Sequence, residues 1–137
     1  MSEPSLSMQD ALRAVGQALN TLSLVALAPL LDDELLYEVQ WHHHEESDVW
    51  LPFEIYGKAP FVEHMTVRFN ARADANKPLF AELGTLPTGP CLVLADGSKD
   101  ELVATVLVDV VGDKIRHLAF CLTPAPSSVA RTGEYPG

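Results

Sequence analysis

The sequence predicts a single α+β domain, with helices first and a meander of strands after them. One apolar stripe recurs at steps of three or four residues between residues 8 and 22, as expected for a helix with one buried face. Its members are Met8, Leu12, Val15, Leu19 and Leu22. Residues 35–41 then alternate as a strand does, and β-like patterns fill residues 77–122. This order is typical of folds in which helices gather on one side of a sheet.

The length and the net charge of the chain indicate which kinds of binding partner are disfavoured. A chain of 137 residues is large enough for one hydrophobic core. It carries 19 acidic and 9 basic residues, a formal charge of −10, which disfavours nucleic acid and anionic membrane surfaces as partners. The longest apolar run, residues 22–31, is too short to cross a bilayer, and the N-terminus lacks a signal-peptide pattern. We therefore expect a cytoplasmic protein.

The two cysteines, Cys91 and Cys121, lie in separate strand-like segments without CxxC spacing. The pattern favours two buried, reduced thiols. A disulfide between neighbouring strands is the alternative, and it would need an oxidising compartment.

Helix signals predict three helices. Ser7 is a good N-cap, and Asp10 in the first turn favours a helix over residues 7–20. A second helix is expected over residues 22–31, where Pro29 either lies in a first turn or forces a kink. The third begins near Pro60, ends near residues 73–76, and has its apolar side at Phe61, Val62, Met65 and Phe69.

Strand signals predict the sheet. In residues 35–41, Tyr37, Val39 and Trp41 share one face, and Leu36, Glu38 and Gln40 share the other. A polar turn at residues 42–48 leads to a second strand within residues 49–56, and Pro52 favours a sheet edge. Further strands are expected over residues 77–86, 91–95, 102–111 and 115–122, with turns at residues 96–99 and 112–113. The domain is thus expected over residues 1–123, and residues 124–137, rich in Pro, Ser, Gly and Thr, read as a poorly ordered C-terminal tail.

Three short segments resemble one fold family. Residues 31–38 resemble its helix end and first strand, residues 56–58 its glycine turn before the third helix, and residues 112–115 its last hairpin. The family is the NTF2-like superfamily, with a cystatin-like α+β fold, which includes SnoaL-like polyketide cyclases and ketosteroid isomerases. The resemblance covers about residues 7–123. It implies N-terminal helices packed on a strongly curved, mixed and mostly antiparallel sheet, a conical apolar pocket, and a homodimer formed through the sheet.

The resemblance makes Glu38 the first catalytic candidate. It lies six residues after Asp32, at the position where the resemblance to ketosteroid isomerases places an aspartate general base. A carboxylate inside an apolar cone has a raised pKa and can shuttle a proton beside a carbonyl. However, the residue here is Glu, and residues 13–16 lack the tyrosine of the isomerase pattern. The alternative is that Glu38 points to solvent, because Tyr37 and its face-mates form the apolar side.

Asp109 is the second catalytic candidate, in a strand of β-branched residues. It either reaches the pocket as an acid or pairs with Arg116 across the hairpin, which is the commoner outcome. His117, with Ile115, Ala119 and Cys121 expected on its own face, either lines the pocket or is half-buried in the core. The remaining pocket candidates are Tyr37, Trp41, Tyr56, His64, Phe69 and Thr105.

A histidine-rich loop offers a weak metal candidate. If the strand continues past residue 41, His42, His44 and Glu46 share one side and present two nitrogens and an oxygen. The alternative is a row of exposed polar loop residues, since no fourth ligand is evident. The sequence contains no GxGxxG, P-loop, GxSxG or HExxH motif, so no cofactor is expected.

Two functions remain open from the sequence. The first is a SnoaL-like protein that binds a small apolar, carbonyl-type ligand in a conical pocket, as an isomerase or cyclase if Glu38 or Asp109 moves protons. The second is a non-catalytic homodimerisation or ligand-carrying module.

Overall fold

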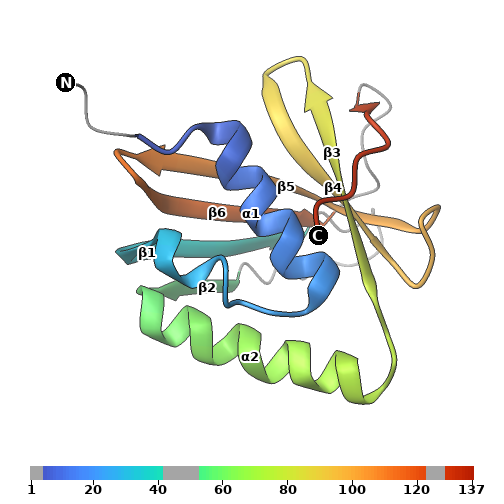
Figure 1. Ribbon diagram of the computed structural model, residues 1–137, viewed down its shortest axis with the longest axis horizontal. Helices are drawn as coiled ribbons and strands as arrows, with labels where there is room; N and C mark the ends of the chain where they lie inside the picture. The colour runs from blue at the N-terminus through green and yellow to red at the C-terminus, as the bar shows by residue number, and fades with distance from the viewer. Residues whose placement is uncertain (1–4, 42–52, 123–128) are drawn as a thin grey trace.

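The computed structural model describes residues 5–41, 53–122 and 129–137, without the side chains of Gln40, Trp41 and Leu122. Helices α1 (Met8–Thr21) and α2 (Lys58–Asp74) and the short 3₁₀ turn η1 (Ala28–Leu30) lie on one side of a sheet (Figure 1). The strands are β1 (Leu31–Trp41), β2 (Phe53–Tyr56), β3 (Leu79–Leu86), β4 (Gly89–Asp96), β5 (Leu102–Val111), β6 (Lys114–Leu122) and β7 (Ala130–Arg131).

The seven described strands form one sheet in the order β2-β1-β6-β5-β4-β3-β7. Only the β1–β6 pair is parallel among these neighbours, so the predicted mixed and mostly antiparallel sheet is confirmed. The sheet is open and curls, with the β3–β4 hairpin at a steep angle to β1 and β2 (Figure 1). Among the described strands β2 lies at the end of the sheet, in agreement with the predicted edge position of the second strand.

Helix α1 confirms the first predicted helix. The Ser7 side chain accepts a hydrogen bond from the Asp10 amide at 3.0 Å, which satisfies one of the free donors of the first turn. The helix ends at Leu22, whose φ of 53° lies in the left-handed region. Its apolar stripe packs across β3, β4 and β5.

The predicted second helix over residues 22–31 is wrong. Leu22 turns the chain out of α1, and in its place residues 28–30 form only the 3₁₀ turn η1, with Pro29 at its start. Proline lacks an amide hydrogen and fits only the beginning of a helical segment, so this short stretch does not extend into a helix. Leu31 then opens β1, four residues before the predicted strand start.

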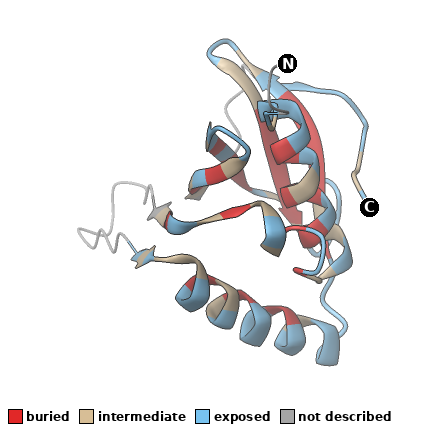
Figure 2. Ribbon diagram, turned by 60° about the vertical axis from the view of Figure 1, so that its left-hand side comes forward, coloured by how far each residue is buried: buried red, intermediate tan, exposed pale blue. Residues whose placement is uncertain are grey.

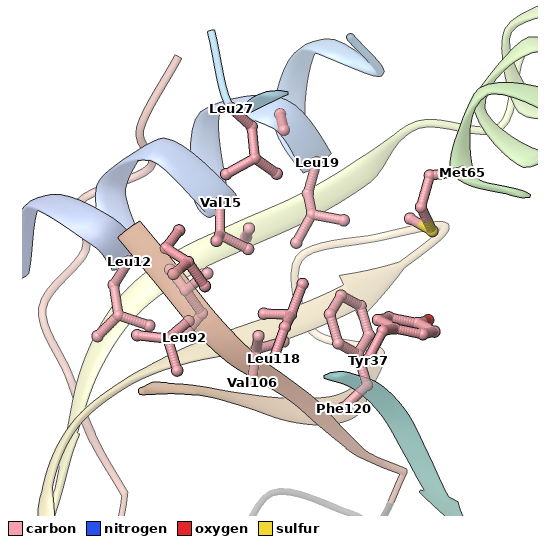
Figure 3. Close-up of a cluster of buried hydrophobic side chains, with 14 of the residues drawn as sticks. Leu12, Val15, Leu19, Leu27, Tyr37, Met65, Leu92, Val106, Leu118 and Phe120 are labelled. Atoms are coloured by element: carbon pink, nitrogen blue, oxygen red, sulfur yellow. The ribbon is translucent and has the colours of Figure 1, made fainter. Parts of the chain in front are cut away.

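The hydrophobic core lies between the sheet and the two helices (Figures 2 and 3). Helix α2 follows Gly57, whose φ of 101° suits glycine, and confirms the third predicted helix. Its buried residues Phe61, Met65 and Phe69 face β1 and β2. The residues labelled in Figure 3 come from both helices, residues 22–30 and four strands: Leu12, Val15, Leu19, Leu27, Tyr37, Met65, Leu92, Val106, Leu118 and Phe120.

The turns follow the predictions, and of the two cysteines predicted to be buried, Cys91 is buried and Cys121 is half-buried. Gly112, with a φ of 65°, lies in the turn that joins β5 to β6, and Gly97, with a φ of 87°, lies between β4 and β5. Cys91 and Cys121 are free thiols. Neither helix in the described part of the chain combines the length and apolar character that a membrane crossing requires.

Residues 129–137 differ from the expectation of a poorly ordered tail. They include β7, which pairs with β3, and they reach α1 through a hydrogen bond from Asn20 to the Pro136 carbonyl. The composition of this segment concealed its contacts, because its partners in β3, α1 and the residues after β4 lie at least 32 positions away in the sequence.

Truncation of Leu118 tests the core. This side chain is fully buried on the inner side of β6, so Leu118→Ala should lower the free energy of unfolding by about 2–5 kcal/mol. Leu107→Ala, at a partly exposed position of β5, is the matched control and should cost less than about 1 kcal/mol. Urea titration followed by circular dichroism measures both. Equal losses would contradict this placement of the core.

Candidate functional site

Strand β1 sends alternate side chains to the two faces of the sheet. We call the face against α1 and α2 the inner face and the opposite one the outer face. Tyr37 pairs with Leu118 of β6 and is buried on the inner face. Glu38 pairs with Ala119 and therefore points to the outer face. The two neighbouring candidates thus lie on opposite sides of the sheet.

Three predicted site residues meet on the outer face, and we call them the outer-face cluster: Glu38, Asp109 and His117. The Nε2 atom of His117 lies 2.9 Å from Oε2 of Glu38, and its Nδ1 atom lies 3.5 Å from Oδ2 of Asp109. The three adjacent strands β1, β6 and β5 supply them, with Asp109 directly opposite His117. Their side chains are 17%, 70% and 33% exposed, in the order Glu38, Asp109, His117.

This geometry has a definite chemical meaning. Each ring nitrogen of His117 faces a carboxylate oxygen, so the ring orientation is fixed from both sides. Such an imidazole can pass a proton between its two ends. Glu38 is neither free in solvent nor aimed into the helical side, because His117 holds it on the outer face. A catalytic role for either carboxylate stays a prediction.

The expected pairing of Asp109 with Arg116 is wrong. Arg116 instead reaches the start of β1, where its Nη2 atom lies 2.8 Å from Oε2 of Glu34 and its Nε atom 4.0 Å from Oδ1 of Asp32. The reason is a register shift between Asp109 and Val110, which places His117 opposite Asp109. The same shift takes Ile115 into the core, away from the face of His117.

The outer face also holds Thr105, Tyr56 and Cys121. Thr105 is buried, and its hydroxyl has no hydrogen-bond partner in the part of the chain that the structure describes. Tyr56 is exposed and donates to the Glu54 carboxylate. Burial, with a smaller contribution from the negative charge of Glu38, raises the pKa of the Cys121 thiol, so this thiol stays protonated and unreactive.

The inner face carries an aromatic cluster around Tyr37. Its ring centroid lies 5.0 Å from that of Phe61, 5.6 Å from that of Phe120 and 6.1 Å from that of His64. Burial raises the pKa of Tyr37 to about 12, so its hydroxyl stays protonated at neutral pH. Burial, and after it the positive charge of Arg68, lowers the pKa of His64. Tyr37, Phe61, Phe120 and Phe69 are all buried in one core.

A groove lies between residues 22–33 and α2, and we call it the helix-side groove. It consists of two hollows, of about 650 and 380 Å³, that share Ala28 and Val62. The first hollow is lined by Ala28, Asp33, Gly57, Lys58, Ala59, Pro60, Val62 and Glu63. The second is lined by Leu22, Ser23, Leu24, Val25, Ala28, Val62, Thr66, Phe69 and Asn70. Neither includes a residue of the outer-face cluster.

Sequence reasoning missed this groove, except for Phe69. The predicted helix over residues 22–31 would have covered α2, whereas the short turn η1 leaves space beside it. The signal was present in Ser23 and Pro29, which interrupt the apolar run.

The histidine-loop candidates His42, His44 and Glu46 lie outside the described residues, as does the side chain of Trp41. Within the described ranges, no three His, Cys, Asp or Glu side chains are grouped as ligands of one metal ion.

Solved structures share this arrangement of helices and strands. An NTF2-like protein of unknown function from Cytophaga hutchinsonii superimposes with a TM-score of 0.56 at 13% identity, over 91% of this chain and 97% of that one. The chain has the NTF2-like fold. A protein of unknown function with a cystatin-like fold from Methylobium petroleophilum gives a TM-score of 0.53 at 10% identity, over 96% of this chain and 90% of that one.

An LEH-like epoxide hydrolase from M. tuberculosis gives a TM-score of 0.50 at 15% identity, over 85% of this chain and 84% of that one. No protein-family model and no curated protein sequence matches the chain. At these identities the similarity establishes the NTF2-like fold alone, and a fold does not by itself determine a function.

A double-mutant cycle tests the outer-face cluster. Glu38→Ala and His117→Ala should couple by about 0.5–1.5 kcal/mol in the free energy of unfolding, because each single change removes the same hydrogen bond. Glu54→Ala with His117→Ala is the control cycle, since the Glu54 carboxylate bonds Tyr56 instead. Urea unfolding supplies the energies, and additive effects for Glu38 and His117 would refute the contact.

The lowered pKa of His64 predicts a pH effect on stability. Because the folded state binds the proton less tightly than the unfolded state, stability should fall as the pH drops below the unfolded value of about 6.5. His64→Gln removes this contribution. The wild-type urea midpoint should therefore fall more than that of the variant between about pH 7.5 and pH 5.5. A smaller fall in the wild type would mean that the pKa is raised.

Proposed function

We propose that this NTF2-like protein is a non-catalytic carrier of a small, mostly apolar molecule, which binds in the helix-side groove. One observation carries the proposal. The groove lies on the helical side of the molecule, whereas the predicted catalytic carboxylates Glu38 and Asp109 lie on the outer face of the sheet.

Proton transfer needs contact. A general base must come within about 2.6–3.2 Å of the proton it removes, directly or through one water molecule. The sheet and the packed inner-face side chains stand between a ligand in the groove and Glu38. The acid and base roles that the family resemblance implied for Glu38 and Asp109 therefore have no support for a ligand in this groove.

The size and lining of the groove suit a small ligand. The two hollows fall within the range of about 300–1,000 Å³ that small-molecule sites occupy. Leu22, Leu24, Val62 and Phe69 offer apolar contact, Lys58 and Asn70 add polar donors, and Asp33 and Glu63 add two acidic groups to the first hollow. This composition suits a molecule that is largely hydrocarbon.

The first turn of α2 favours a ligand with a carbonyl oxygen. Gly57, Lys58 and Ala59 line the groove, and among the described residues no side chain caps this end of the helix. The first amide groups of a helix lack partners within the helix and attract an oxygen acceptor. The preferred ligand is therefore an apolar carbonyl compound, as in the first function predicted from the sequence.

A blocked groove tests the proposal. Val62 lines both hollows, so Val62→Arg should weaken the binding of the neutral apolar dye Nile red at least about tenfold, since it replaces apolar contact by a charge. Val67→Arg is the matched control, because Val67 is exposed on the same helix and lines neither hollow. Fluorescence titration measures both.

Glu38→Gln completes this experiment. It should leave Nile red affinity unchanged, because Glu38 faces away from the groove. Loss of binding in Glu38→Gln but not in Val62→Arg would move the ligand site to the outer face and revive the acid–base function.

A second function, homodimerisation, is favoured by the exposed outer face. Strand β5 exposes the apolar side chains Val103, Leu107 and Val111 on one face, and no helix in the described part of the chain covers them. Apolar side chains exposed on a sheet face often belong to an interaction site, and here the exposed Asp109 lies between Leu107 and Val111. We propose that a second copy of the chain packs here.

A charge in this surface tests the homodimer. Leu107→Asp should convert a dimer to a monomer, because it buries a carboxylate in the interface. Val67→Asp, on the exposed side of α2, should leave the mass unchanged. Sedimentation equilibrium measures the mass, and a monomeric wild type would remove this proposal.

A further inference from the structure

The C-terminal segment, residues 129–137, lies along the β3 strand as an added strand (Figure 1). Arg131 pairs with Gly84 and Ala130 with Thr85. The Leu83 amide donates to the Glu134 carbonyl at 2.9 Å, and the Thr132 amide donates to the Leu83 carbonyl at 3.2 Å. The segment therefore uses the hydrogen-bonding edge that β3 would otherwise present.

The side chain of Glu82 on β3 accepts hydrogen bonds from the C-terminal segment. This carboxylate is only 4% exposed and accepts from Nε of Arg131 at 2.7 Å, from the Gly133 amide at 2.7 Å and from the Tyr135 hydroxyl at 3.2 Å. Burial alone would raise the pKa of Glu82, but these hydrogen bonds outweigh it and the pKa is lowered. These three partners of the buried charge all come from the C-terminal segment.

Helix α1 supplies a second pocket, for Pro136. The side-chain amide of Asn20 donates to the Pro136 carbonyl at 2.6 Å and also bonds both the amide and the carbonyl of Ala81. Gly16 makes room for the proline ring, because a Cβ atom there would lie 3.0 Å from Cγ of Pro136. An Asn held by the sheet and a missing side chain together shape a site for this residue.

The two partners differ in burial. The receiving residues Ala81, Glu82 and Leu83 are buried, whereas residues 130–134 of the segment are exposed. The segment therefore lies on a surface built by β3 and α1 and contributes little to the core. This is the arrangement of a peptide added to a sheet edge, in which main-chain bonds give affinity and side-chain pockets give specificity.

We propose that the β3–α1 surface is a peptide-docking site for extended segments of the pattern Arg-x-Gly-x-Tyr-Pro, occupied by the chain's own C-terminal segment and open to the same pattern in another polypeptide. Arg and Tyr of the peptide reach Glu82, glycine gives its amide to the same carboxylate, and proline enters the pocket beside Gly16. The chain's own segment is a competitor that occludes the site.

The chain's own C-terminal segment competes with an added peptide for the site, so the measured affinity of the peptide depends on this competition. A tethered segment acts at an effective concentration of about millimolar, so a free peptide binds the wild-type chain weakly. Weakening the tethered segment opens the site. Arg131→Ala removes its shortest side-chain bond to Glu82 and leaves the receiving surface intact.

The test uses a fluorescein-labelled peptide with the sequence of residues 129–137 and full-length protein. Arg131→Ala protein should bind this peptide at least about tenfold more tightly than the wild type does, because a hydrogen bond between charged groups is lost only from the competitor. A peptide with Ala in place of the same Arg should lose this gain. Amide shifts of Glu82, Leu83 and Asn20 should report the site. Equal affinities for the two proteins, or shifts on another surface, would overturn the proposal.

If Arg131→Ala protein does not fold, hydrogen exchange on the wild-type protein tests the proposal instead. The Leu83 amide, bonded to the segment, should exchange at least about tenfold faster than the amide of Val106 in the core, because the segment opens without global unfolding. Equal protection at both sites would mean that the segment is a fixed strand and the site does not exchange its occupant.

Discussion

The register of the parallel pair β1–β6 is the constraint on which the other features depend. It places Tyr37 beside Leu118 and Glu38 beside Ala119. Because side chains alternate along a strand, a slip of one residue would exchange the two faces of β1 completely. The register is held by hydrophobic burial, since Leu35 and Tyr37 enter the core that Phe61 of α2 closes. This packing therefore places Tyr37 in the apolar core and Glu38 on the outer face of the sheet.

This separation explains why the fold alone leaves the function open. A general base must reach the proton that it removes, so the position of the carboxylates relative to a bound ligand bears on function more than the fold does. In this chain Glu38 bonds His117 on the outer face, and the space beside α2 is lined mostly by apolar residues and the first turn of that helix, with Asp33 and Glu63 at one hollow. The C-terminal segment adds a third surface, built around the buried charge of Glu82.

Local patterns predicted most of the fold, and contacts between distant residues account for what they missed. The stripe ending at Leu22, the turn at Gly112 and the apolar side of α2 follow from periodicity and turn chemistry, which act over a few residues. The register shift after Asp109 places Asp109 opposite His117, and no local sequence pattern predicts this shift. Arg131 likewise finds Glu82 across 49 positions of sequence. The candidate residues Glu38, Asp109 and His117 were identifiable one by one, but their meeting required the register.

The most direct test of the account is the side-chain environment of β1 in solution. Nuclear Overhauser effects measured on labelled protein should connect the Tyr37 ring to Phe61 and Phe120, and the Glu38 methylene groups to the His117 ring. Contacts from Glu38 to Phe61 or Met65 would show the opposite register. That result would place the carboxylate under the helices and contradict the division of the two faces.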